Sequence, residues 1–170
     1  EVIGEFLRRA TAACEAAPGE FEIIIVDDGS TDGTWDMIAA AAAQDGRIRG
    51  VRLARNFGHQ AALTAGLQIC RGEKILLIDA DLQDPPELLG EMLELMRSAG
   101  ADVVYGQRRS REGVGWLKQQ CYKSFYRVLS WLSGVDIPPD TGDFRLVTRR
   151  AVECVNAMPE QQRFLRGMFS

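Results

Sequence analysis

The stretch from Lys74 to Pro86 reads KILLIDADLQDPP and joins a short apolar run to a group of carboxylates. The apolar run, residues 75–78, is typical of a short buried strand, since Gly72 precedes it and two prolines follow. Asp79 and Asp81 then lie two residues apart, so both side chains can turn toward one point beyond the carboxyl end of the strand, where open α/β sheets bind ligands. Two carboxylates at one point suit Mg²⁺ or Mn²⁺ beside nucleotide phosphates, although a turn capped by Asp fits the same pattern.

The composition is that of one ordinary globular domain. The chain has 170 residues, of which 46% are hydrophobic and 26% charged, and its formal net charge is -4. This charge gives no support for nonspecific binding to nucleic acid, so we expect no nucleic-acid partner. No window approaches the roughly 18 apolar residues that span a bilayer, and we expect the chain as written to be soluble.

The beginning of the sequence has the spacing of an amphipathic helix. Val2, Ile3, Phe6, Leu7 and Ala10 recur at helical intervals directly after Glu1. A helix of an α/β unit normally follows a strand, and none precedes this one. We therefore expect the first strand of the fold to be missing from the sequence.

A second buried strand is predicted over residues 21–26, FEIIIV, a run rich in β-branched residues. It ends at Asp27 and Asp28, and the polar residues 29–34 then lead into a helix. Because this loop lies at the carboxyl end of its strand, Asp27 could accept hydrogen bonds from a base or a ribose while Asp28 braces the turn. An ordinary turn explains the same residues equally well.

The polar residues 55–60 stand directly before a helix predicted over residues 61–70. Free backbone N–H groups at a helix N-terminus favour anions, so a phosphate could bind near this point. His59 is the only histidine of the chain. A single histidine at the start of a helix is more often a capping or packing residue than a catalytic one, and we assign it that role here.

The remainder of the chain continues the α/β pattern. A strand over residues 101–106 leads to a loop with Arg108, Arg109 and Arg111, which either holds phosphates or is a solvated basic loop. An amphipathic, aromatic-rich helix over residues 116–132 packs on the sheet or lies on a membrane surface. A last strand over residues 140–147 is followed by a helix over residues 149–158.

Three separated motifs together resemble the inverting GT-A glycosyltransferases, and a fourth fits one branch of them, the polyprenyl-phosphate hexosyltransferases. They are VDDGS at residues 26–30, NFGHQAA at residues 56–62, DADLQDPPE at residues 79–87 and GDFRL at residues 142–146. The branch they resemble most is the polyprenyl-phosphate hexosyltransferases, which include dolichyl-phosphate mannose synthase and the bactoprenol glucosyltransferases. The resemblance covers nearly the whole chain.

This resemblance implies a single catalytic domain over residues 1–170, truncated at both ends. The implied fold is α/β, a GT-A-like, Rossmann-related and mainly parallel sheet flanked by helices, without its first strand. The implied partners are a UDP- or GDP-hexose as donor, Mg²⁺ or Mn²⁺ as cofactor, and an undecaprenyl or dolichyl phosphate as acceptor at the cytoplasmic side of a membrane. A homo-oligomer is left open.

The resemblance also implies roles for individual residues. Asp81 and Gln83 match the metal position, and Asp143 and Arg108 match catalytic positions. The nucleotide-sugar positions are Ile25, Asp27, Asp79, Ala80, Asp81 and Arg108. Asp143 stands where other inverting members carry the base that deprotonates an acceptor hydroxyl. A phosphate acceptor is already an anion near neutral pH, however, so Asp143 could orient the acceptor or the basic cluster instead.

Three other readings of the sequence remain. A transferase that acts on a glycan or another hydroxyl acceptor would carry the same motifs, and so would an inactive fragment of such an enzyme. The aspartyl-nucleophile phosphohydrolases also use Asp-x-Asp after a strand, but they normally have Thr or a small residue soon after the second Asp, where this chain has residues 82–85, LQDP. Processive synthases have Gln-x-x-Arg-Trp, and residues 161–164 read QQRF, which favours transfer of a single sugar.

Overall fold

The computed structural model describes residues 2–107, 141–160 and 163–169. Its elements are α1 (Val2–Ala16), β1 (Ile23–Asp27), α2 (Thr34–Gln44), β2 (Ile48–Arg52), α3 (His59–Ile69), β3 (Lys74–Leu77), the short 3₁₀ helix η1 (Pro86–Leu88), α4 (Leu89–Ala99), β4 (Val103–Gln107), β5 (Thr141–Thr148), α6 (Arg149–Ala157) and α7 (Leu165–Met168). The predicted basic loop with Arg108, Arg109 and Arg111, and the helix predicted over residues 116–132, lie outside the described residues.

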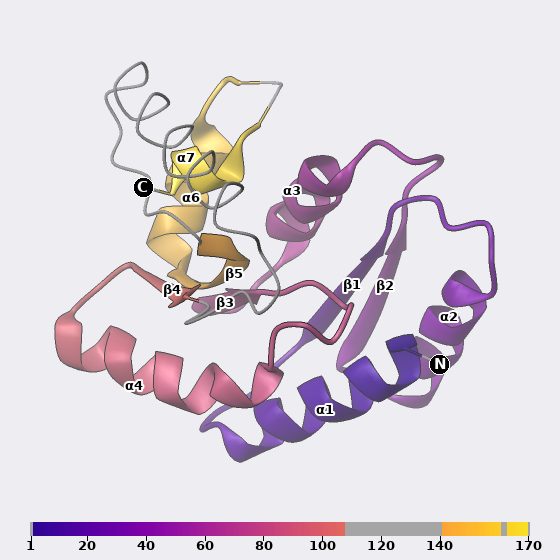
Figure 1. Cartoon of the computed structure of the whole chain (residues 1–170), viewed down its shortest axis with the longest axis horizontal. Coiled ribbons are helices and arrows are strands. Elements are labelled where there is room, and N and C mark those ends of the chain that lie inside the picture. Colours follow the sequence, from indigo (N-terminus) through magenta and orange to yellow (C-terminus); the bar gives the residue numbers. More distant parts are fainter. Residues whose placement is uncertain (1, 108–140, 161–162, 170) are drawn as a thin grey trace, which may run out of the picture.

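The strands form two small sheets (Figure 1). β1 and β2 pair in parallel, with Ile23 opposite Ile48. The second sheet has the order β3-β5-β4, and β5 runs antiparallel to both of its neighbours. The α/β class with parallel strands and flanking helices is confirmed, and the departure from a parallel arrangement is β5, which lies between β3 and β4 with reversed direction. A buried strand shows the same apolar run in either direction, so the sequence pattern could not reveal this.

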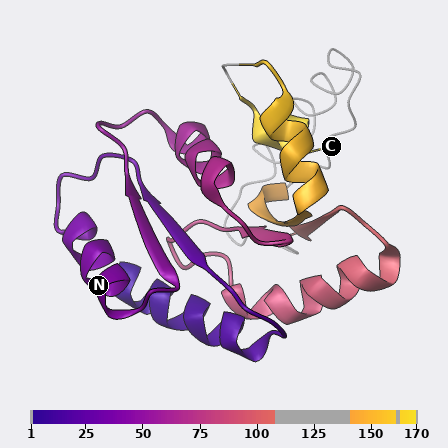
Figure 2. The same cartoon turned by 180° about the vertical axis from the view of Figure 1, so that it is seen from behind.

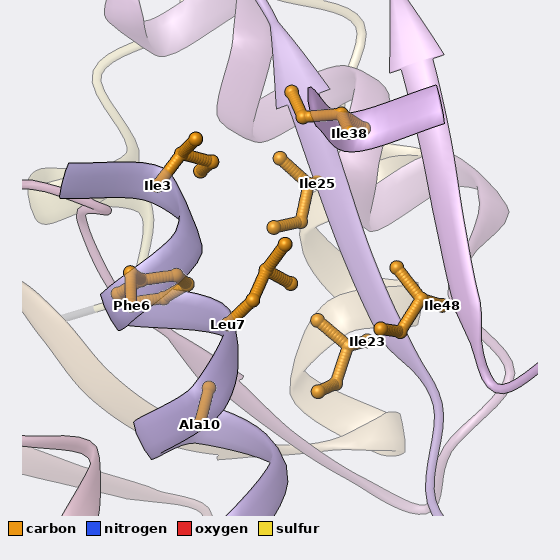
Figure 3. Packing of buried hydrophobic residues seen from close by; sticks show 8 residues of the cluster. All are labelled: Ile3, Phe6, Leu7, Ala10, Ile23, Ile25, Ile38 and Ile48. Atoms are coloured by element: carbon orange, nitrogen blue, oxygen red, sulfur yellow. The ribbon is translucent and has the colours of Figure 1, made fainter. Parts of the chain in front are cut away.

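Helices cover the strands on two sides, with α1 and α4 on one side and α3 and α6 on the other (Figures 1 and 2). α1 contributes its apolar stripe to a core that it shares with α2, β1 and β2. The buried members of this core are Ile3, Phe6, Leu7, Ala10, Ile23, Ile25, Ile38 and Ile48 (Figure 3). Burial of such a stripe, at roughly 25 cal/mol per Å² of apolar surface, stabilises the helix more than its intrinsic propensity does.

β5 is the buried centre of the second sheet. Phe144, Leu146 and Val147 are at most 3% exposed, and they contribute to two cores, one shared with α4 and β4 and the other with α3, α6 and α7. Because both faces of β5 are covered, its polar residues Asp143 and Arg145 are carried into the interior as well. Among the described helices, none is long and apolar enough to cross a membrane.

Candidate active site

The loops that follow β1 and precede α3 are locked together by backbone hydrogen bonds to one carboxylate. Asp28 accepts the N–H groups of Phe57 and Gly58, at 2.7 and 2.9 Å. Gly29 has a φ of 75°, and a Cβ added there would lie 2.6 Å from the backbone nitrogen of Asn56. Asp28 therefore braces the neighbouring loop, whereas the sequence predicts that it braces its own turn, and the close approach of the two loops requires glycine at position 29.

Asp27 is held within its own turn. Its side chain is buried, and Oδ1 accepts the N–H of Ser30 at 2.9 Å. Oδ2 is buried and accepts no hydrogen bond from the residues that the structure describes, and the Arg52 Nε lies 3.5 Å from it. Ile25, which the resemblance places at the nucleotide, points its side chain into the core below this loop (Figure 3). Of these two residues, only Asp27 therefore has a side chain at the carboxyl edge of the sheet.

The loop after β3 presents its carboxylates through an unusual backbone conformation. Asp81 is exposed, and its Oδ1 accepts the N–H of Gln83 at 3.0 Å. Between them, Leu82 adopts a φ of 65°, which costs about 1–3 kcal/mol for a residue with a branched side chain. Its side chain packs against the core of α1 and β1, and this contact holds the strained turn in place.

Asp79 and Ala80 lie between β3 and this turn, and both are half-buried. Burial raises the pKa of Asp79, and the carboxylates of Asp143, Asp81 and Asp84 raise it further, while His59 opposes them. Asp79 therefore lies in a concentration of negative charge that a cation would relieve. Within the described ranges, no group of three or more His, Cys, Asp or Glu side chains is close enough to hold a metal ion by itself.

Asp143 is the centre of a buried network of charged groups. Its Oδ1 accepts Arg145 Nη2 at 2.9 Å and Arg166 Nε at 3.2 Å. Its Oδ2 accepts Arg166 Nη2 at 3.2 Å and lies 2.9 Å from His59 Nε2. Although burial by itself raises the pKa of Asp143, the hydrogen bonds and charges of Arg166, His59 and Arg145 outweigh it and lower this pKa.

Arg145 is fully buried and lies under two aromatic rings. Its guanidinium carbon is 5.4 Å from the ring centre of Tyr105 and 5.6 Å from that of Phe169. Its Nη1 also donates to the carbonyl of Leu165, which joins the network to the start of α7. Aromatic faces and a carboxylate together compensate the charge in the interior.

His59 connects the two carboxylate groups. Its Nε2 lies 2.9 Å from Asp143 Oδ2 and 3.6 Å from Asp79 Oδ1. The His59 ring does not cap α3, because it reaches to the end of β3 and into β5, and its assignment to packing and not to chemistry stays a prediction. Sequence reasoning also missed Arg145 and Arg166. Arg145 could have been found from its position two residues after Asp143, on the same face of a strand, whereas no local pattern marks Arg166.

The sequence of this chain matches a known family over most of its length. Residues 1–155 match the family described as Glycosyl transferase family 2. The chain belongs to this family. A glycosyltransferase of Synechocystis sp. is 45% identical over 150 residues, which are 88% of this chain and 47% of that protein. The bactoprenol glucosyl transferase of Shigella phage SfV is 37% identical over 170 residues, all of this chain and 55% of that protein.

A solved structure of the same general fold is a mannosyltransferase from Pyrobaculum calidifontis in complex with GDP-Man and Mn²⁺. It superimposes with a TM-score of 0.61 at 21% identity, over 93% of this family 2 chain and 44% of that structure. This likeness supports the GT-A character of the α/β fold. The chain spans about half the length of the curated relatives it matches.

Proposed function

We propose that this chain transfers one hexose from a UDP- or GDP-hexose to a polyprenyl phosphate, with inversion at the anomeric carbon and with Mg²⁺ or Mn²⁺. Membership of family 2 supports hexosyl transfer. The bactoprenol acceptor named for the phage relative supports a lipid phosphate, and the GDP-Man and Mn²⁺ bound by the structural neighbour support the donor class and the ion.

The observation that carries the choice of acceptor is the saturation of Asp143. Its two oxygens receive three hydrogen bonds from Arg145 and Arg166. His59 supplies a fourth with the proton on Nε2, since an ionised carboxylate only accepts, and a carboxylate has about four acceptor sites. A carboxylate with a lowered pKa and no open acceptor site is a poor base for an alcohol. A phosphate monoester needs no such base, because it is already an anion near neutral pH. The network therefore fits an orienting role for Asp143.

The other residues fit the donor side of the site. Asp79 is half-exposed beside His59 and would accept hydrogen bonds from sugar or ribose hydroxyls. The buried Oδ2 of Asp27 accepts no hydrogen bond within the described part of the chain, and it would take one from the base if the half-exposed Arg52 shifted. Asp81 and Gln83 offer oxygen ligands on an exposed turn, which suits an ion that keeps water and phosphate as its other ligands.

The reaction would join an acceptor phosphate oxygen to the anomeric carbon while the bond from that carbon to the nucleoside diphosphate breaks. The bound ion would neutralise charge on the leaving diphosphate. Arg108, outside the described residues, would face the diphosphate or the acceptor phosphate. His59, placed between Asp79 and Asp143, would keep the donor side and the acceptor side at a constant separation, which favours in-line attack.

The first test is substitution of Asp81 by Asn, with Glu91→Gln on the exposed face of α4 as the matched control. We expect Asp81→Asn to lose Mn²⁺-dependent binding of UDP or GDP in calorimetry, and metal-dependent transfer, while its circular dichroism spectrum is unchanged. Glu91→Gln should retain both. Unchanged binding and turnover in the Asp81 variant would refute the metal assignment.

The second test compares acceptors under one set of donor conditions. We expect transfer to polyprenyl phosphate and none to a free saccharide or an alcohol without phosphate. Preferential transfer to a saccharide would favour the alternative, a transferase for hydroxyl acceptors. If the chain binds neither nucleotide with Mn²⁺, it is an inactive fragment of such an enzyme.

A further inference from the structure

The short helix α7 is held beside the charge network by contacts that do not use the Arg166 side chain. The N–H of Leu165 donates to Gln60 Oε1 of α3 at 3.0 Å, and Leu165 is fully buried among apolar side chains of α3, β3, β5 and α6. At the other end of the turn, the hydroxyl of Tyr105 on β4 donates to the carbonyl of Phe169 at 2.9 Å. The fold therefore places the backbone of Arg166 independently of the groups that its guanidinium binds.

The guanidinium of Arg166 lies side-on to the Asp143 carboxylate. Its Nε donates to Oδ1 and its Nη2 donates to Oδ2, both at 3.2 Å. A guanidinium has five N–H donors in one plane, so this pairing turns the other end of the fork away from Asp143. The Arg166 side chain is 31% exposed, whereas that of Arg145 is 0% exposed. Of the two arginines on Asp143, Arg166 is therefore the one that a ligand from solution can reach.

The charges on the two sides of His59 have opposite signs. On one side, the lowered pKa of Asp143 keeps this group ionised near neutral pH, and two guanidinium groups face it, so that these three side chains carry an excess of positive charge. On the other side, Asp79 lies among the carboxylates of Asp81 and Asp84. A phosphate anion is therefore attracted to the side of Arg166, whereas on the side of Asp79 it needs a bound cation.

We propose that Arg166 binds the phosphate group of the acceptor, and that Asp143 is the positioning residue that holds its guanidinium. This inference rests on the proposed function and names a residue that would recognise the acceptor. An arginine fork donates two parallel hydrogen bonds to a phosphate and supplies a positive charge, whereas a hydroxyl acceptor offers neither a pair of oxygens nor a negative charge. Because His59 contacts both Asp143 and Asp79, a phosphate on Arg166 lies beside a sugar on Asp79, as in-line attack requires.

The test is calorimetric titration with farnesyl phosphate, a short polyprenyl phosphate, in the presence of Mn²⁺ and whichever of UDP and GDP the chain binds. We expect the unsubstituted chain to bind farnesyl phosphate at least about tenfold more tightly than farnesol, which lacks the phosphate. Arg166→Gln should weaken the binding of farnesyl phosphate by about 10- to 100-fold, the effect of losing hydrogen bonds to a charged group. Its affinity for the nucleotide with Mn²⁺ should not change. Arg166→Lys, which keeps the charge but not the fork, should recover part of the loss.

Arg97→Gln on α4 is the matched control, because it makes the same substitution in an exposed pair, and it should bind both ligands as the unsubstituted chain does. A kinetic readout separates phosphate binding from a merely structural role. Arg166→Gln should raise the KM for polyprenyl phosphate by a similar factor and leave the KM for the nucleotide sugar unchanged, whereas a distorted site would change both. If the Gln variant loses its fold, Arg166→Lys, which keeps the charge beside Asp143, carries the same test.

The outcomes separate this inference from the proposed function. Binding of farnesyl phosphate that Arg166→Gln leaves unaltered would overturn the role of Arg166 and keep the lipid phosphate as acceptor. A loss of affinity for the nucleotide with Mn²⁺ by the same factor would also overturn it, because Arg166 would then bind the donor diphosphate. Equal binding of farnesyl phosphate and farnesol by the unsubstituted chain would refute the proposed class of acceptor, and the role of Arg166 with it.

Discussion

Replacement of Asp143 by Asn tests the buried charge network directly. Asp143 is 4% exposed and Arg145 is 0% exposed, so removal of the carboxylate charge deprives the buried Arg145 guanidinium of the negative charge 2.9 Å from its Nη2. The amide that replaces one oxygen also presents donors to Arg166 or His59, which themselves donate. Breaking one partner of a buried pair costs about 3–5 kcal/mol, and we expect a loss of that size in the free energy of unfolding.

The assay is urea unfolding followed by circular dichroism at pH 7. The loss should be seen as a lower midpoint with an unchanged m-value. Glu94→Gln is the matched control, because Glu94 pairs with Arg97 on α4 with side chains that are 64% and 73% exposed. We expect that change to leave the midpoint unaltered. A loss below about 1 kcal/mol for Asp143→Asn would refute the reasoning, since that is the effect of an exposed pair.

The effect of Asp143→Asn on the free energy of unfolding should depend on pH. Because the folded chain lowers the pKa of Asp143 below its ordinary value of 3.8, this group contributes stability above that value, and the contribution is lost as the pH falls through the lowered pKa. The difference in unfolding free energy between the natural chain and Asp143→Asn should therefore be constant from pH 7 to pH 5 and shrink below pH 4. A difference that grows toward acid pH would contradict the direction of the shift.

Three further predictions concern the loops around the site. Gly29→Ala should lower the free energy of unfolding by more than about 1–2 kcal/mol, because φ is 75° and the added Cβ would clash with the backbone of Arg55 and Asn56. Gly33→Ala is the control, and it should be neutral in the same urea assay because no atom lies within 4 Å of a Cβ added there. Asp79→Asn should abolish nucleotide-sugar binding but raise the Tm at pH 7, because burial disfavours the charged Asp79 carboxylate and raises its pKa. This gain in Tm should vanish as the pH falls through the raised pKa, where Asp79 of the unsubstituted chain becomes neutral as well. His59→Ala, which removes one hydrogen bond to a charged group, should lower kcat by about 10- to 100-fold, and an unchanged kcat would exclude its positioning role.

The sequence determined the class of the fold and the order of its elements to within a few residues. The apolar runs at residues 21–26 and 75–78 became β1 and β3, and the spacing of Ile3, Phe6 and Leu7 became the buried stripe of α1. These features are local, since a strand or an amphipathic helix is encoded by the period of its own residues. The position of Asp28 after a strand was also local information, but the loop that it holds, at residues 57 and 58, was not.

Only the tertiary structure decided which distant residues meet. Direction in a sheet is a pairing between segments far apart in the chain, so the reversed β5 between β3 and β4 had no local signal. The same holds for the contacts of His59 on α3 and Arg166 on α7, which both reach the Asp143 carboxylate on β5. The sequence by itself placed Asp27, Asp79 and Asp81 at the ends of strands, because strand ends are readable from local pattern, whereas Asp143 was singled out by the family resemblance. The structure decided that Asp143 is saturated by its neighbours, because that depends on which side chains the fold buries beside it.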